Sequence, residues 1–226
     1  MNTTYAGRLE EWLRTHENAA AAEPMSAYMR NQFPFLGIKN PERAALTKQF
    51  IKGNGVPSGE ELEEVALKLW ALPEREFQYT AMQLLEKRLE EAAPSQAKLL
   101  EILITTKPWW DTVDLIAGHL VGSLFTRYPE LVPAHAHRWI ESDNLWLRRS
   151  ALLFQLGYKG RTDRELLFSF IRRCAGEKDF FIRKAIGWAL REYGKTDAEA
   201  VRQFVRETEL SPLSVREALK RIGSEA

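Results

Sequence analysis

The residues of this chain whose types and spacing suit chemistry lie between positions 106 and 114. Trp110 and Asp114 are four residues apart, so on a helix they share one face, one turn from each other. We expect Thr106 to cap that helix and Pro108 to lie in its first turn. A carboxylate beside an indole is unusual on a solvated helix. By itself, the pair also fits a tryptophan packed in the core next to solvated acids, so the choice depends on what recurs along the chain.

The elements that would position this pair repeat at a fixed spacing. Strand-like alternation is nearly absent, and apolar residues recur every three and four positions, which predicts an all-helical protein. Segments with matching apolar columns begin 35 residues apart, with a fifth after 33. They start at Pro73, Pro108, Asp143, Lys178 and Ser211.

A second set of helices is expected between these segments, so that each repeat is a helical hairpin of about 35 residues. The chain is therefore predicted to be an α-solenoid of HEAT-like hairpins. We predict one domain, 1–226, with capping helices in 1–52 and about five hairpins in 53–226. The expected intervening helices are Gly59–Ala71, Ser95–Thr105, Pro129–Ile140, Asp163–Ala175 and Ala198–Glu207, and the expected capping helices are Glu10–Thr15, Pro24–Phe33 and Pro41–Lys52.

The register places equivalent residues of successive repeats in one column. The column lies two residues beyond the first core position of each helix, which points it away from the core. His119 falls instead in a core column and is expected to be buried. One surface is thus predicted to carry Trp110, Asp114, Arg149, Lys184 and Trp188, with Arg148, Arg183 and Arg216 along its side.

The chemistry of these residue types is complementary. Arginine and lysine at solenoid spacing suit a phosphate backbone, and tryptophan offers an apolar face to a sugar or a base. A carboxylate is a poor ligand for DNA, so Asp114 is more suited to chemistry. It would stabilise the positive charge that develops on deoxyribose as an N-glycosidic bond breaks. A purine alkylated at N3 or N7 is already cationic, so its departure needs no general acid.

The overall composition indicates the cellular compartment of the protein more clearly than its function. The 32 basic and 31 acidic residues give a net charge of +1, with the basic excess in the C-terminal half. Cys174 is the single cysteine, which excludes an internal disulfide and fits a reducing, cytoplasmic compartment. We see no signal-peptide pattern and no run of about 18 apolar residues that would span a membrane.

Several long motifs in order resemble the AlkD-like DNA alkylation repair family, which are HEAT-like 3-methyladenine/7-methylguanine DNA glycosylases. They include EPMSAYMRNQFPFLGI at Glu23–Ile38, TKPWWDTVD at Thr106–Asp114, SDNLWLRRSALLFQL at Ser142–Leu156 and KAIGWALREYGKT at Lys184–Thr196. The resemblance implies a solenoid whose concave face cradles duplex DNA, and an enzyme that acts without a metal and without flipping the base into a pocket. The essential groups of the family fall on Trp110, Asp114, Arg149 and Trp188, and a tyrosine near the DNA falls on Tyr28.

The sequence thus predicts a monofunctional alkylpurine DNA glycosylase that needs no cofactor, acts as a monomer and binds double-stranded DNA. Arg149 is expected to hold the phosphate beside the damaged nucleotide, and Arg148, Arg183 and Lys184 to contact the DNA backbone. The main alternative is a HEAT-like scaffold that binds DNA or protein without chemistry. A Schiff-base role for Lys184 is the weaker enzymatic alternative. The sequence does not rank 3-methyladenine, 7-methylguanine and bulkier adducts.

Overall fold

The computed structural model describes residues 4–222, and the regular structure in that range is helical throughout. Its helices pair as antiparallel neighbours, so the prediction of an all-α fold of stacked helical hairpins is confirmed. The chain divides into two compact units, residues 1–96 and 97–226. The prediction of a single continuous domain stays a prediction. No helix within residues 4–222 is long and apolar enough to cross a membrane.

The first unit contains five α-helices and a short 3₁₀ turn within its described residues. The predicted helix at 59–71 has the expected bounds. The first helix begins earlier than predicted, because Thr4 caps it by accepting a hydrogen bond from the Gly7 N–H at 3.2 Å. The helices are α1 (Tyr5–Arg14), α2 (Ala19–Tyr28), α3 (Asn40–Asn54), α4 (Gly59–Ala71) and α5 (Arg75–Lys87), followed by η1 (Leu89–Glu91).

A buried carboxylate organises the loop that precedes α3. Glu76 on α5 is fully buried and accepts hydrogen bonds from the backbone N–H groups of Leu36, Gly37 and Ile38 at 3.0, 2.9 and 3.1 Å. The acid thereby satisfies three buried backbone donors of this loop. Gly37 has φ +88° and lies against α2, where a Cβ atom would overlap the Asn18 carbonyl. This loop needs both the acid and the glycine.

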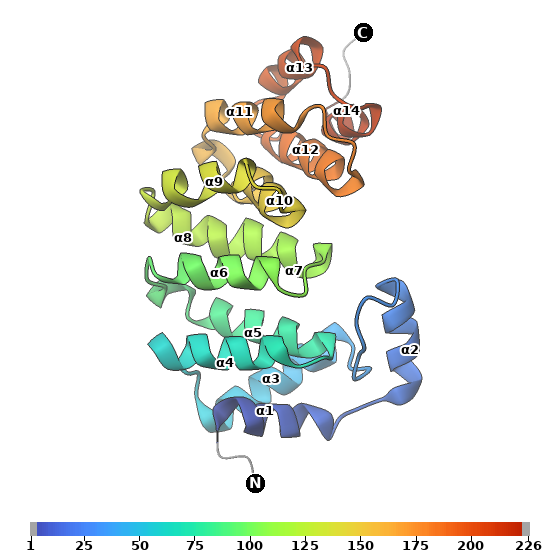
Figure 1. Ribbon diagram of the computed structural model, residues 1–226, viewed down its shortest axis with the longest axis vertical. Coiled ribbons are helices and arrows are strands. Elements are labelled where there is room, and N and C mark those ends of the chain that lie inside the picture. Colours follow the sequence, from blue (N-terminus) through green and yellow to red (C-terminus); the bar gives the residue numbers. More distant parts are fainter. Residues whose placement is uncertain (1–3, 223–226) are drawn as a thin grey trace. The chain divides into compact units, whose positions relative to one another are not determined.

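The second unit continues the hairpin pattern, and Figure 1 shows its helices in successive pairs from α6 (green) to α13 and α14 (red). The column residues predicted for the core of α10 and α12, such as Leu147, Phe154, Ile182 and Ile186, are buried. The elements are α6 (Gln96–Thr105), α7 (Trp110–Leu115), η2 (Ile116–Val121), α8 (Gly122–Arg127), η3 (Val132–Ala136), α9 (His137–Ile140), α10 (Leu145–Leu153), η4 (Lys159–Arg161), α11 (Arg164–Cys174), α12 (Phe180–Tyr193), α13 (Ala198–Glu207) and α14 (Pro212–Leu219).

Side-chain caps fix where most helices of this unit begin. Asn144 accepts hydrogen bonds from the N–H groups of Trp146 and Leu147, and Asp179 does the same for the first turn of α12. Asp163, Asp197 and Ser211 cap α11, α13 and α14 in the same way. Each cap satisfies donors that the first helical turn leaves unpaired. The positions of the functional side chains along α10 and α12 follow from these starts.

The prediction that His119 is buried was wrong. Residues Ile116–Val121 form a π-helical turn, which takes more residues per turn than an α-helix. The core position after Ile116 is therefore filled by Leu120, and His119 is exposed. Gly122 follows the π turn and lies so close to α10 that a Cβ atom would overlap the Phe154 carbonyl oxygen.

Candidate active site

The site helix starts three residues later than the sequence predicted, with Trp109 rather than Thr106 as its N-cap residue. Lys107 adopts a left-handed conformation with φ +50°, and Trp109 is extended with φ −158°. Because this turn carries Pro108 outside the helix, Trp110 is its first residue and Thr106 does not cap it. A non-glycine residue in the left-handed region is uncommon and stores strain next to the predicted site.

Trp109 anchors the start of α7 in an aromatic cluster. Its ring centroid lies 5.9 Å from that of Trp146 on α10 and 5.2 Å from that of Phe181 on α12, and Trp146 and Phe181 are 5.0 Å apart. The cluster joins three successive repeats at the point where the functional side chains emerge. The adjacent tryptophans of the sequence thus have different tasks, because Trp109 packs and Trp110 lies one helical turn before Asp114.

Asp114 and Arg149 form a bidentate ion pair. Arg149 Nε donates to Asp114 Oδ1 at 2.7 Å, and Arg149 Nη2 donates to Oδ2 at 2.8 Å. The arginine side chain is 1% exposed, whereas the carboxylate is 19% exposed. Each carboxylate oxygen therefore uses one lone pair on the arginine and keeps acceptor capacity on its open side.

Arg149 has further partners that hold it beneath the site. Its Nη1 donates to the backbone carbonyl of Phe181 at the start of α12. Its guanidinium carbon lies 5.3 Å from the Trp188 ring centroid and 5.9 Å from that of Phe181. Arg149 thus contacts Asp114 and Trp188 of the neighbouring repeats, but the prediction that its column points away from the core was wrong for Arg149, whose side chain is buried.

The electrostatics of Asp114 reflect two opposed influences. Burial raises the pKa of the Asp114 carboxyl above its ordinary value, and the hydrogen bonds and charge of Arg149 act in the opposite direction. The nearby negative charge of Asp111 adds a smaller upward contribution to this pKa. The ionised form of Asp114 consequently depends on Arg149 remaining in place.

The predicted DNA-binding residues of this unit have varied surroundings. Lys184 Nζ lies 3.0 Å from Glu217 and 5.5 Å from the Trp188 ring centroid. Arg148 Nε lies 3.4 Å from a carboxylate oxygen of Glu177, and Arg183 Nε donates to the Glu177 backbone carbonyl at 2.8 Å.

Two further predicted DNA contacts are exposed. Arg216 lies on the surface of α14. Tyr28 belongs to the first unit, is the last residue of α2 and is 71% exposed. These geometries leave the predicted contacts with DNA as proposals.

Sequence reasoning missed Phe181 and Glu217. Phe181 accepts a hydrogen bond from Arg149 and belongs to the aromatic cluster, and its signal was its register position, equivalent to that of Trp146. Glu217 lies next to Arg216, which the register singled out, but an acid beside a basic strip reads as a solvated charge. Only the packing of α14 on α12 reveals its partners.

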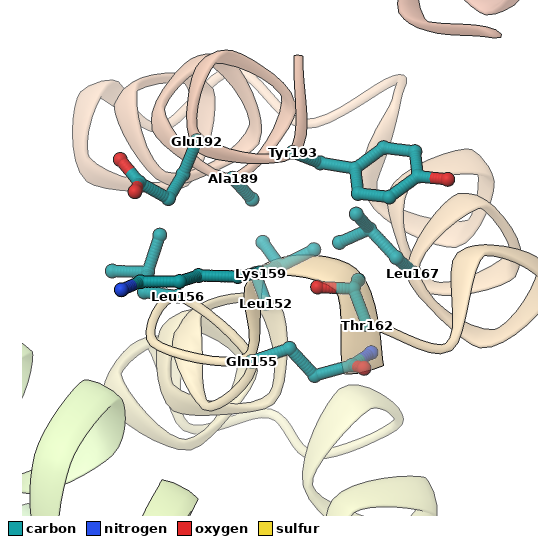
Figure 2. Close-up of a pocket in the computed structure, with 9 residues that line it drawn as sticks. All are labelled: Leu152, Gln155, Leu156, Lys159, Thr162, Leu167, Ala189, Glu192 and Tyr193. Carbon is teal, nitrogen blue, oxygen red and sulfur yellow. The ribbon is translucent and has the colours of Figure 1, made fainter. Parts of the chain in front are cut away.

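Two hollows in this unit do not include the predicted catalytic residues. Figure 2 shows one of about 10 Å³, lined by residues such as Leu152, Ala189 and Tyr193 from α10 and α12. Such a space holds about one water molecule. A wider hollow of about 480 Å³ has apolar walls that include Phe125 and Phe154.

Other groups with possible chemistry have ordinary surroundings. Within residues 4–222, no three His, Cys, Asp or Glu side chains are placed together as a metal site would require. Cys174 is buried, and burial raises the pKa of its thiol to about 11. A buried thiol with so high a pKa is a poor nucleophile at neutral pH.

Comparisons with known proteins identify the family. The family of DNA alkylation repair enzymes matches residues 9–222 of this chain. A solved structure described as a predicted DNA alkylation repair enzyme from Enterococcus faecalis is similar, with 35% sequence identity and a TM-score of 0.86. The match covers 92% of this chain and 98% of that one. Comparison with curated proteins gives no match. The chain thus belongs to the DNA alkylation repair enzyme family.

Proposed function

We propose that the protein is a DNA glycosylase that hydrolyses the N-glycosidic bond of cationic N3- and N7-alkylated purines in duplex DNA. The observation that carries this proposal is the Asp114 carboxylate, held bidentately by buried Arg149 and itself 19% exposed, with Trp110 one helical turn before it and Trp188 against Arg149. A fixed negative charge beside two indoles suits a sugar that becomes cationic as its base departs. Family membership supports a DNA substrate with alkylation damage.

In this mechanism the carboxylate acts on the sugar rather than on the base. Asp114 stabilises the oxocarbenium character of deoxyribose and orients the attacking water through its open lone pairs. The electron pair of the broken bond goes to the alkylated purine, which leaves as a neutral base. The water loses a proton to solvent or to Asp114 as it bonds to C1′. Trp110 and Trp188 pack against the sugar and exclude bulk water.

The buried position of Arg149 changes the role expected for it. An arginine with 1% exposure whose donors bind Asp114 and the Phe181 carbonyl is poorly placed to hold a DNA phosphate. We assign it to positioning: it fixes the plane of the carboxylate and favours its ionised form. The proposed phosphate contacts then fall to Lys184, Arg148, Arg183 and Arg216, with Tyr28 as a contact from the first unit.

The proposal also includes a monomer in the cytoplasm that uses no metal or other cofactor and leaves the base within the duplex rather than in a pocket. A non-catalytic DNA-binding scaffold is the competing function. Because such a scaffold needs no carboxylate on a DNA-binding surface, the open Asp114 favours the enzyme.

Release of free base from defined duplexes tests the function. We expect release of 7-methylguanine or 3-methyladenine under single-turnover conditions and no release of uracil, because a neutral pyrimidine is a poor leaving group without an acid. Liquid chromatography of the free bases measures both. Binding of the alkylated duplex without release of any base would favour the scaffold, and release of uracil at a similar rate would contradict the mechanism.

A further inference from the structure

The Trp188 indole is surrounded by cations, and their arrangement extends the proposed function. Lys184 lies one turn before Trp188 on α12 and Arg191 almost one turn after it. Their charged atoms lie 5.5 and 5.9 Å from the ring centroid, and Arg149 approaches it at 5.3 Å. Cations at such distances are attracted to an indole face. Arg149 is neutralised by Asp114, so Lys184 and Arg191 require another partner.

Glu217 on α14 is that partner for both residues. One of its carboxylate oxygens lies 3.0 Å from Lys184 Nζ, and the other accepts a hydrogen bond from Arg191 Nη1 at 2.8 Å. The Glu217 side chain is 11% exposed, and the side chains of the two cations are about twice as exposed. The hydrogen bond from Lys184 lowers the pKa of Glu217, so the acid is ionised at neutral pH.

A glycine allows α14 to bring Glu217 to this position. A Cβ atom on Gly187, the residue before Trp188, would overlap the Glu217 Cβ and come within 3.0 Å of the Ser214 carbonyl oxygen. The Ser214 hydroxyl also donates to the Arg183 carbonyl on α12 at 2.9 Å. The backbone of α14 therefore packs directly on α12 beside the indole, which fixes the acid between the two cations.

We propose that Glu217 is a positioning residue that holds Lys184 and Arg191 against Trp188, so that the indole wall and two cations are preorganised for the sugar and phosphate of the damaged nucleotide. This inference rests on the proposed glycosylase function. Long cationic side chains lose conformational entropy when they bind a phosphate, and an acid that orders them beforehand reduces that loss. Two cations and one buried anion leave a net positive charge for DNA.

Replacing Glu217 distinguishes a positioning role from the effect of its negative charge alone. Glu217→Gln makes the surface more positive, so charge alone predicts tighter DNA binding and an unchanged rate of base release at saturating enzyme. Positioning predicts instead that the single-turnover rate at saturation falls about tenfold, since small misplacements strongly affect rate. Affinity should change little, because the cost of ordering the freed cations offsets the gain from the lost negative charge. The two readings therefore differ in which quantity changes.

Glu199→Gln is a matched control. Glu199 on α13 also contacts two arginines, Arg202 at 3.4 Å and Arg206 at 3.1 Å, and its side chain is exposed. We expect this variant to keep the wild-type rate and affinity. Thermal unfolding of both variants shows whether a lower rate of Glu217→Gln follows from lost stability. A rate loss that disappeared on cooling the variant would assign Glu217 a structural role only.

A readout on the indole itself does not depend on catalysis. The Trp188 indole N–H resonance can be assigned by its loss in Trp188→Phe. We expect Glu217→Gln to shift this resonance more than the other tryptophan resonances, and Glu199→Gln to leave it unchanged. If Glu217→Gln does not fold, Arg191→Met removes one of the held cations, keeps an apolar stem and should shift the same resonance.

The outcomes distinguish this inference from the proposed function. An unshifted Trp188 resonance in Glu217→Gln, or in Arg191→Met where the first variant is unfolded, overturns the positioning role. Wild-type protein that releases no base overturns the glycosylase function, and the resonance then decides alone whether Glu217 orders the cations. A shifted resonance with tighter binding and an unchanged rate would also overturn the proposal, because order at Trp188 would then be irrelevant to chemistry.

Discussion

Two carboxylates, Glu76 sealed in the first unit and Asp114 partly buried in the second, show how the same group can be used for folding or left open for chemistry. Glu76 in the first unit is sealed and accepts three backbone N–H bonds, two of them on one oxygen. Asp114 in the second unit accepts two bonds from one arginine and remains partly exposed. Burial raises the pKa of both carboxyl groups, and the hydrogen bonds to each oppose that rise.

Glu76 and Asp114 differ in the groups that donate hydrogen bonds to them and in how many lone pairs each carboxylate keeps free. The donors of Glu76 belong to a loop whose own pairing depends on the acid, so the acid completes the fold. The donor of Asp114 is a side chain from the next repeat, and the Asp114 side chain keeps 19% of its surface exposed. A partly exposed carboxylate with free lone pairs retains the capacity to act on a ligand.

The largest expected effect is that of Asp114→Asn. The change keeps the shape and removes the negative charge, so single-turnover release of 7-methylguanine should fall on the order of a hundredfold or more, near 3 kcal/mol. Affinity for DNA should persist or rise, because an anion is lost from a surface that binds a polyanion. Circular dichroism should confirm that the variant is folded, since Arg149 loses part of its partner.

Asp143→Asn serves as its control, because Asp143 is an exposed acid in the turn before α10. It should keep the wild-type rate. Near-wild-type release of base by folded Asp114→Asn would mean that the catalytic group lies elsewhere. Asp114 would then not differ from Glu76 in having a chemical role.

The second effect concerns stability and should appear at the other carboxylate. Glu76→Ala leaves three buried N–H groups without an acceptor, so the free energy of unfolding should fall by roughly 3 kcal/mol. Urea denaturation measures the change. Glu86→Ala is the control on the same helix, because Glu86 is exposed, and should change the stability by less than about 0.5 kcal/mol. Equal effects of the two substitutions would show that the Glu76 hydrogen bonds do not hold the loop.

The sequence could predict Asp114 but not Glu76, and the reason is physical. Asp114 belongs to a repeat register, so its column partner Arg149 and its neighbour Trp188 follow from periodicity. Glu76 acts on a loop some forty residues away, and no local pattern encodes that contact. The predicted start of α7 was wrong because the left-handed conformation of Lys107 depends on tertiary packing and has no local sequence signal. The π turn that exposes His119 was equally hidden, because apolar spacing alone does not reveal an extra residue per turn.

The third effect is a shift in the pH dependence of the excision rate. It tests whether Arg149 controls the ionisation of Asp114. The carboxylate is active when ionised, so the excision rate should fall as pH falls through its raised pKa. In Arg149→Lys a single ammonium replaces the two-pronged guanidinium and opposes the effect of burial less. The pKa of Asp114 therefore rises further, and the decline in rate begins at a higher pH than in the wild type. Rates measured from pH 5 to 8, corrected for spontaneous base loss, give the profiles. Superimposable profiles would show that Arg149 does not control the ionisation of Asp114.

The smallest expected effect tests whether the open side of Asp114 belongs to a DNA-binding surface. Arg216 is exposed on α14, next to the acid that contacts Lys184 and Arg191. If its guanidinium contacts a phosphate, Arg216→Ala should weaken binding to all duplexes alike and reduce the slope of log affinity against log salt by about one unit. Arg206→Ala removes an exposed arginine that contacts Glu199 on α13 and should leave the slope unchanged. Fluorescence anisotropy at several salt concentrations measures both. Identical slopes for wild type and Arg216→Ala would mean that DNA does not reach α14, and the proposed backbone contacts would then have to come from Lys184, Arg148 and Arg183 alone.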